Sequence, residues 1–198
     1  MTATSDSSTS KFEHPEGSSL AVLLAASIAS TIGGLPFNAL PLMLGSLADS
    51  RGMSPEAVGL LGSICFGGYL VGTLSAPAWM NRMNWRWLTA VCAAGTALAF
   101  VASALVGDGL ALKLAWAAIG LFASSMTCMG LRVITELANK TRAFGVRQGV
   151  ELSISSAVLF ALPPLVIQAW GYTGGASALA LVVGILGLSA IGLPSGRQ

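Results

Sequence analysis

Residues 152–196 read LSISSAVLFALPPLVIQAWGYTGGASALALVVGILGLSAIGLPSG, which is 45 consecutive residues without a charged side chain. A helix needs about 20 predominantly apolar residues to cross the hydrocarbon core of a bilayer, so this stretch is long enough for two crossings. The glycine-rich segment 171–175 interrupts it near the middle, and such clusters are typical of breaks between helices. The stretch therefore predicts two membrane-spanning helices joined by a short turn.

Four earlier charge-free runs are each long enough for one crossing. They occupy residues 17–48, 57–81, 87–107 and 114–131. The chain as a whole has 198 residues, of which 54% are hydrophobic and only 9% are charged. Soluble domains carry about 25% charged residues, so this composition excludes a water-soluble monomer.

The sequence thus predicts an all-α membrane protein with six transmembrane helices. The expected spans are 20–46, 55–79, 85–106, 110–134, 148–170 and 175–193, within a bundle that covers residues 20–194. Residues 1–19 are polar and rich in Ser and Thr, so we expect a disordered tail there. Residues 195–198 form a second, short tail.

The distribution of basic residues predicts the orientation, because cytoplasmic loops hold the excess of Lys and Arg. Arg51 and Lys113 fall on one side of the six spans, and the other eight Lys and Arg fall on the opposite side. Those eight are Lys11, Arg82, Arg86, Arg132, Lys140, Arg142, Arg147 and Arg197. We therefore expect a multi-pass protein of the cytoplasmic membrane with both termini in the cytoplasm.

Several chemistries lack the residues that they require. The only histidine is His14, in the tail, and Cys65, Cys92 and Cys128 fall in three different spans without a CxxC pair. Neither GxxxxGK[ST] nor GxGxxG occurs, and no clustered basic face is present. We therefore expect no enzyme activity, cofactor, metal site or nucleic-acid partner.

Glycines in the second span suggest a close helix contact. Gly68 and Gly72 have the GxxxG spacing that lets two backbones approach in a membrane. One interpretation is packing within the bundle, and the other is packing against a second bundle.

Two long segments resemble the major facilitator superfamily of transporters. The first is residues 35–88, LPFNALPLMLGSLADSRGMSPEAVGLLGSICFGGYLVGTLSAPAWMNRMNWRWL, and the second is residues 136–172, ELANKTRAFGVRQGVELSISSAVLFALPPLVIQAWGY. The similarity includes a proline-containing first helix, a glycine-rich second helix and a short basic loop after it. In that loop Arg82 and Arg86 match the family motif GxxxDRxGRR, whereas Asn81, Asn84 and Trp85 depart from it.

The resemblance implies a fold and a function for the chain. Family members have two six-helix halves, each built from two inverted three-helix repeats, so this chain corresponds to one half in a 3+3 arrangement. The resemblance implies transport of a small solute as a secondary transporter, with a second copy or a separate six-helix half completing the path. The alternative is a six-span accessory protein that binds a membrane partner and transports nothing.

Polar side chains inside the spans are the candidate binding residues, because they are costly in a bilayer and often functional. Ser27, Thr31, Gly34 and Asn38 share one helical face of the first span. For the hydroxyl groups, the alternative is a hydrogen bond back to their own helix. Pro36 lies within this face and frees a backbone carbonyl.

The fourth and fifth spans carry further candidates. Ser125, Cys128 and Arg132 share one face of the fourth span, and the resemblance implies that the first and fourth helices line a central cavity. The substrate-binding candidates are Thr31, Asn38, Ser125 and Arg132.

Glu151 is the only acid well inside an apolar stretch, so it is the candidate for proton coupling. Its alternative role is an ion pair with Arg147 one turn earlier. The resemblance also suggests an inner-gate charge network made of Arg82, Arg86, Glu136 and Arg142.

Overall fold

The computed structural model describes residues 16–80, 82–137 and 139–193, and within these ranges the chain is helical with no strand. The elements are α1 (Glu16–Arg51), α2 (Pro55–Trp79), α3 (Trp85–Leu105), α4 (Leu110–Thr135), α5 (Lys140–Leu162), η1 (Pro163–Ile167), α6 (Gln168–Gly187) and η2 (Leu188–Gly192). The element η1 is a π-helical turn and η2 is a 3₁₀ turn. The predicted all-helical fold is confirmed for the described residues.

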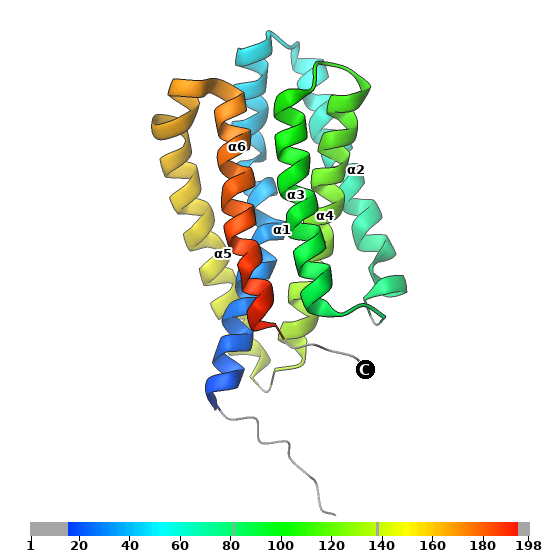
Figure 1. Ribbon diagram of the computed structural model, residues 1–198, viewed down its shortest axis with the longest axis vertical. Helices are drawn as coiled ribbons and strands as arrows, with labels where there is room; N and C mark the ends of the chain where they lie inside the picture. The colour runs from blue at the N-terminus through cyan, green and yellow to red at the C-terminus, as the bar shows by residue number, and fades with distance from the viewer. Residues whose placement is uncertain (1–15, 81, 138, 194–198) are drawn as a thin grey trace, which may run out of the picture.

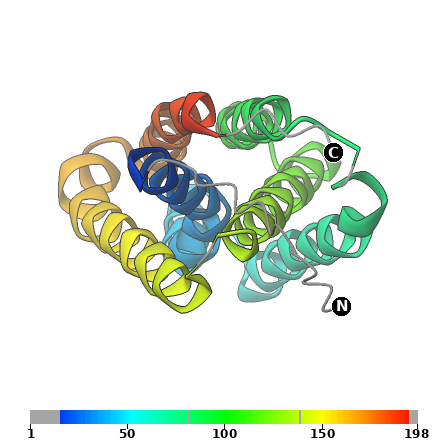
Figure 2. The ribbon, with the colours of Figure 1, turned by 90° about the horizontal axis from the view of Figure 1, so that it is seen from below.

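Helices α1 and α4 form the centre of the bundle (Figure 1). Helix α1 contacts α4, α5 and α6, whereas α4 contacts α1, α2 and α3. Helices α3 and α6 contact each other and lie side by side along one edge, with α5 and α2 at the two ends (Figure 2). The core therefore consists mainly of the buried apolar faces of α1 and α4.

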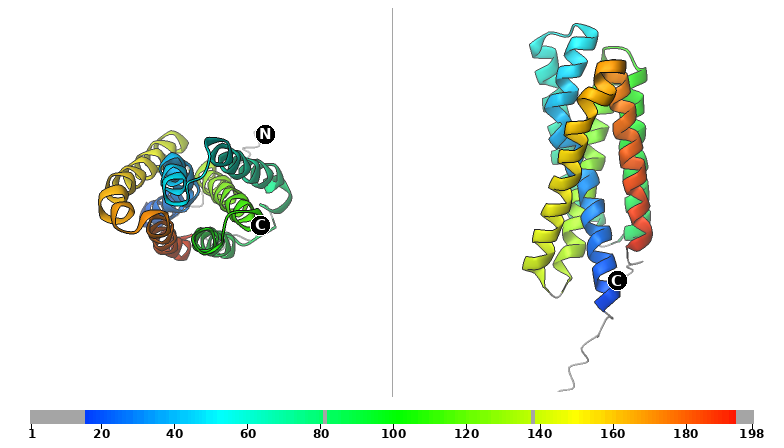
Figure 3. Two further views of the ribbon diagram at one scale, coloured as in Figure 1. Left: turned by 90° about the horizontal axis from the view of Figure 1, so that it is seen from above. Right: turned by 90° about the vertical axis from the view of Figure 1, so that its left-hand side faces the viewer.

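Five stretches of helix in the described chain are long and apolar enough to cross a membrane. They are Leu20–Arg51, Pro55–Trp79, Trp85–Leu105, Leu110–Thr135 and Lys140–Gly192. The last has 53 residues and includes both α5 and α6, which run in opposite directions (Figure 3). These apolar helices fit a membrane protein.

The turn between α5 and α6 begins earlier than the glycine cluster at 171–175 suggests. Helix α5 ends at Leu162, directly before Pro163 and Pro164, because a proline nitrogen has no hydrogen to donate to the helix. Gly171 then has φ 58° and ψ −150°, a backbone conformation that is essentially restricted to glycine. The reversal therefore depends on the two prolines and on this one glycine.

Helices α1 and α5 extend beyond the predicted spans at polar ends. Helix α1 continues to Arg51 and stops at Gly52, whose φ of 61° suits a residue that follows a helix. Helix α5 begins at Lys140, where the Asn139 side chain accepts a hydrogen bond from the Arg142 backbone N–H. Hydropathy marks the apolar part of a helix, whereas these polar ends are set by capping.

Parts of the expected tails are outside the described residues. Helix α1 already begins at Glu16, so residues 16–19 of the expected disordered tail are helical. Residues 1–15 and the tail 195–198 lie outside the described residues, and with them Lys11, His14 and Arg197. The motif position Asn81 also lies outside them.

Close packing of α2 against α4 uses the predicted glycines. A Cβ added at Gly68 would collide with the Ala117 carbonyl, and one added at Gly72 would collide with Ser124 and the Leu121 carbonyl. Both glycines therefore contact α4 of the same chain, which is the packing within the bundle that the spacing allowed. Their small size is therefore needed inside the bundle.

Candidate functional site

Helices α1 and α5 meet in three successive layers, which we call the α1–α5 ladder. Each layer has a polar side chain from α5, which faces a polar side chain or, in the middle layer, a glycine of α1. The residues of the ladder are Ser30, Gly34 and Asn38 on α1 and Arg147, Glu151 and Ser155 on α5. Each layer joins residues separated by 117 positions in sequence. The two helices run in the same direction, and residues on each are spaced by four, so successive turns stay in register.

The first two layers hold an ion pair. Arg147 Nη2 donates to Glu151 Oε2 at 2.8 Å, and Arg147 Nε donates to the Ser30 hydroxyl at 2.6 Å. The side chains of Arg147 and Glu151 are each 12% exposed. The alternative suggested by sequence, a pair with Arg147 at i−4, is therefore what the structure has, with Ser30 as a third member.

Gly34 makes room for the Glu151 carboxylate. A Cβ at Gly34 would collide with Glu151 Oε1, so the carboxylate lies directly against the α1 backbone. One carboxylate oxygen bonds Arg147 and the other faces α1. A carboxylate accepts several hydrogen bonds, so the oxygen that faces α1 retains acceptor capacity for a proton, water or substrate donor.

Asn38 forms the third layer. Its Nδ2 donates to the Ser155 hydroxyl at 3.0 Å, and Ser155 is buried whereas Asn38 is half-buried. The amide oxygen of Asn38 has no partner among the described residues. The ladder thus places the Glu151 carboxylate against Gly34, about one turn of α1 before Asn38, on one side of the bundle centre.

Two other predicted binding residues bond to their own helices. The Thr31 hydroxyl donates to the Ser27 carbonyl at 2.9 Å, and the Ser125 hydroxyl donates to the Leu121 carbonyl at 2.9 Å. Thr31 is fully buried and Ser125 nearly so. Both hydroxyls thus bond to the backbone carbonyl one turn earlier, which is the alternative that the sequence left open for them.

Among the described residues, the four charges suggested for an inner gate are not paired with one another. Glu136 pairs with Arg132 at 3.1 Å within the last turn of α4, because both lie on one face at i,i+4. Arg86 Nε instead donates to the Leu193 carbonyl. Arg82 and Arg142 are exposed and belong to no ion pair among the described residues. Arg132, a predicted binding residue, is thus paired with Glu136 at the end of α4.

The opposite end of the bundle has a polar cluster around Arg51. Its guanidinium donates to Asp108 Oδ1 at 3.0 Å and to the Ser103 carbonyl at 3.1 Å, and it lies 5.6 Å from the centre of the Tyr172 ring. The hydroxyls of Ser103 and Tyr172 are 2.7 Å apart. This cluster ties the end of α1 to α3 and to the beginning of α6.

Sequence reasoning grouped Asn38 and Glu151 with the candidates but did not assign Ser30. The available signal was the equal spacing of four in Ser30-Gly34-Asn38 and in Arg147-Glu151-Ser155. Such matching intervals identify two faces that can pair in register between parallel helices. They do not identify the pairing itself, since α5 could equally have packed on α4.

Among the described residues, no group of His, Cys, Asp and Glu has a geometry that could hold a metal ion. No protein-family model, curated protein or solved structure matches the chain.

Proposed function

We propose that the chain is a membrane transporter subunit that moves a small solute by alternating access, in the manner of one half of a major facilitator transporter. The observation that carries the proposal is the α1–α5 ladder, in which an ion pair and an amide lie together inside an apolar bundle. Charged and amide groups at such a place are costly unless they bind or relay something. The subunit would lie in the cytoplasmic membrane with both termini inside.

The contact pattern of the helices supports a 3+3 arrangement. If α1, α2 and α3 are exchanged with α4, α5 and α6, the contact of α2 with α4 becomes that of α5 with α1. In the same way, α3 with α4 becomes α6 with α1, and the pairs α1 with α4 and α3 with α6 are unchanged. Corresponding helices run in opposite directions (Figure 1). This is the pattern expected of two inverted repeats.

The uncovered side of α5 supports a need for a second half. Only Ala143, Ser155 and Leu162 are buried on α5, and Gln148, Ser153 and Ser156 are exposed. Polar groups in contact with lipid are unfavourable, so this face is better satisfied by a partner helix or a water-filled path. Alternating access requires such a partner, because one bundle must move against another around the site.

Transport assays in proteoliposomes test the proposal. Vesicles with a trapped pH-sensitive dye would be challenged with panels of amino acids, monosaccharides, organic acids and organic cations. We expect at least one solute class to drive proton movement in the parent protein, and we expect Glu151→Gln to abolish its pH dependence. If two copies of the chain are associated in the vesicles and none of these solutes drives proton movement, proton-coupled transport by this chain is contradicted.

Glu136→Gln is the matched control for that variant. Glu136 also pairs with an arginine at i,i+4, but its side chain is 36% exposed at the end of α4. We expect this variant to keep the parent's pH dependence. An unchanged pH dependence in Glu151→Gln would remove the coupling role from Glu151 while leaving transport itself intact.

A second candidate function is a membrane accessory protein that binds a partner and transports nothing. It is favoured by the internal pairing of the ladder, since Glu151 has Arg147 and Asn38 has Ser155 as partners without any substrate. In that case the ladder stabilises α5 on α1, and the exposed polar face of α5 serves recognition alone. Binding of a partner by a chain inactive in every transport assay distinguishes this function.

A further inference from the structure

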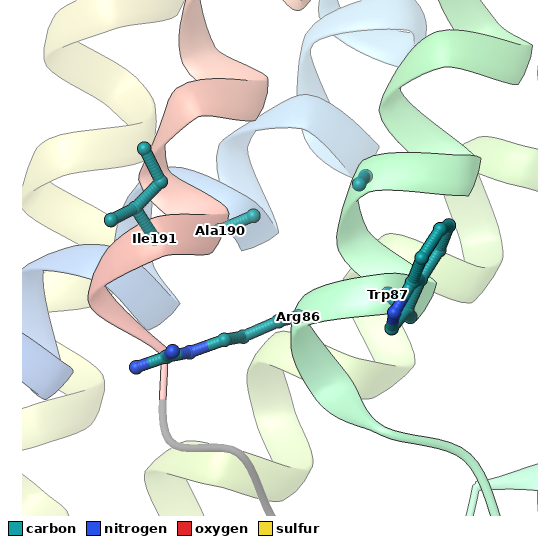
Figure 4. A pocket seen from close by; sticks show the side chains of 5 residues that line it. Arg86, Trp87, Ala190 and Ile191 are labelled. Atoms are coloured by element: carbon teal, nitrogen blue, oxygen red, sulfur yellow. The ribbon is translucent and has the colours of Figure 1, made fainter.

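A groove between α3 and η2 lies at the same end of the bundle as the beginning of α1. It has a volume of about 310 Å³ and is lined by Arg86, Trp87, Ala90, Ala190 and Ile191. Figure 4 shows Arg86 reaching from α3 across to the end of the last helix, below Ala190 and Ile191. The walls of the groove are thus apolar, and a guanidinium lies across its lower end.

The surroundings indicate that the groove opens toward lipid. Helices α3 and α6 and the turn η2, which adjoin the groove, carry exposed apolar side chains. They include Val91, Leu98, Ile185 and Leu188. Trp87 is 68% exposed, and tryptophan is enriched where a membrane surface meets water. Apolar walls near the membrane surface suit a hydrocarbon chain, such as the acyl chain of a lipid.

The positive charge of Arg86 favours an occupant that carries a negative charge. Arg86 Nε bonds the Leu193 carbonyl, whereas no ion pair among the described residues includes Arg86. Arg82 is exposed in the turn that precedes α3, and residues 57–107 contain no acid. Planar guanidinium groups match phosphate oxygens in geometry and charge. The headgroup at the Arg86 end of this groove should therefore carry a phosphate and a net negative charge.

We propose that this groove is a binding site for one anionic phospholipid, with an acyl chain between α3 and η2 and the phosphate on the Arg86 guanidinium. The site connects α3 to the end of the last helix through one lipid molecule. It depends only on the bundle lying in a membrane and does not rest on the proposed transport function.

Native mass spectrometry of the purified protein tests this site. The protein would be given phosphatidylglycerol and phosphatidylcholine with identical acyl chains in equal amounts. We expect phosphatidylglycerol to be retained preferentially, and we expect Arg86→Gln to weaken its binding roughly tenfold, as for the loss of one charge-assisted hydrogen bond. Arg82→Gln is the matched control and should leave retention unchanged, because Arg82 does not line the groove.

A second pair of variants tests the groove without altering charge. Ala90→Phe should fill it and lower retention of the lipid, whereas Ala94→Phe, one turn further along the exposed side of α3, should not. Thermal unfolding curves verify that each variant is folded.

Equal retention of the two lipids by the parent protein, or equal losses in Arg82→Gln and Arg86→Gln, would overturn the proposal. So would competition by glycerol 3-phosphate as effective as that by the whole lipid, since the acyl groove would then contribute nothing.

Discussion

At the scale of single residues, two ion pairs of identical spacing have different surroundings. Arg147–Glu151 and Arg132–Glu136 are both i,i+4 pairs, but the first is 12% exposed on each side chain and the second is 39% and 36% exposed. Sequence spacing alone cannot distinguish them. The packing of α1 over Arg147, through Ser30 and Gly34, removes that pair from solvent.

Removal of one charge should therefore have unequal effects on the two pairs. We expect Arg147→Gln to lower the free energy of unfolding by about 3 to 5 kcal/mol, because a buried carboxylate loses its partner. Arg132→Gln should cost less than about 1 kcal/mol, as is usual for exposed pairs. The measurement is SDS-induced unfolding in mixed micelles.

A double variant provides the control for this prediction. Arg147→Gln combined with Glu151→Gln should recover much of the loss, since neither charge is then left unpaired. Equal losses for Arg147→Gln and Arg132→Gln would show that the ladder is as well solvated as the helix end.

The Asn38–Ser155 hydrogen bond should contribute a smaller energy. A double-mutant cycle with Asn38→Ala and Ser155→Ala should give a coupling of about 0.6 kcal/mol, and at most about 1.7 kcal/mol, as for hydrogen bonds between membrane helices. Unfolding in mixed micelles measures each corner of the cycle. The cycle of Asn38→Ala with Ser153→Ala is the control, because Ser153 is exposed on α5, and a coupling of the same size there would refute the bond.

At the scale of elements, the contact of α2 with α4 depends on backbone approach. A Cβ at Gly120 would collide with the Cys65 carbonyl and lie 2.9 Å from the Tyr69 nitrogen, and one at Gly68 would collide with the Ala117 carbonyl. The atoms that would be struck belong to backbones, so no rotamer change can relieve the clash. The two helices would have to separate.

Alanine substitutions should lower the stability at glycines that touch α2 or α4 backbone, but not at glycines with free space around them. We expect Gly120→Ala and Gly68→Ala to destabilise the protein by about 1 to 3 kcal/mol, as other overpacked positions do. Gly59→Ala and Gly67→Ala are the controls on α2, because nothing lies within 4 Å of a Cβ there. These two should be neutral or stabilising by up to about 1 kcal/mol in thermal unfolding. Equal stability of Gly120→Ala and Gly59→Ala would contradict the close approach.

Elements also show where sequence reasoning succeeds and fails. Residues 55–79 form both the predicted second span and α2, because Ser54 and Pro55 mark the start and the basic loop marks the end. The predicted limits of the fifth span differ from α5, because its polar first turns are held by the Asn139 cap and its end is set by Pro163. Local signals thus predict helix starts and stops, whereas apolar composition predicts only the segment that suits a membrane.

At the scale of the whole molecule, the candidate site depends on which helices become neighbours. The sequence offered Asn38 and Glu151 as polar residues within apolar helices, but their common location follows from α5 packing on α1 in parallel. Thr31 shares the predicted face of α1 with Asn38, yet it is buried and bonded to its own helix. Helical periodicity gives a face, and only the assembled bundle decides which part of that face meets another polar helix.

The uncovered helices α2 and α5 lead to a prediction about assembly, since a lone bundle cannot provide alternating access. In a chain whose cysteines at 65, 92 and 128 are replaced by alanine, single cysteines would be introduced at Leu74 on α2, Phe160 on α5 and Leu98 on α3. These side chains are 71%, 83% and 68% exposed, so exposure alone does not distinguish them. We expect oxidation in membranes to crosslink two copies through positions 74 and 160 but not through position 98.

The reason for this difference is the polar surface beside Phe160, where Ser153 and Ser156 are exposed, whereas α3 presents apolar side chains suited to lipid. Crosslinks from positions 74 and 160 to a polypeptide of another mass would assign the second half to a different chain. Crosslinking of position 98 as readily as 160 would show random collision and remove the preferred face. A protein that remains monomeric in membranes, with no crosslink from any position, would leave alternating access without its second bundle and would favour the accessory function.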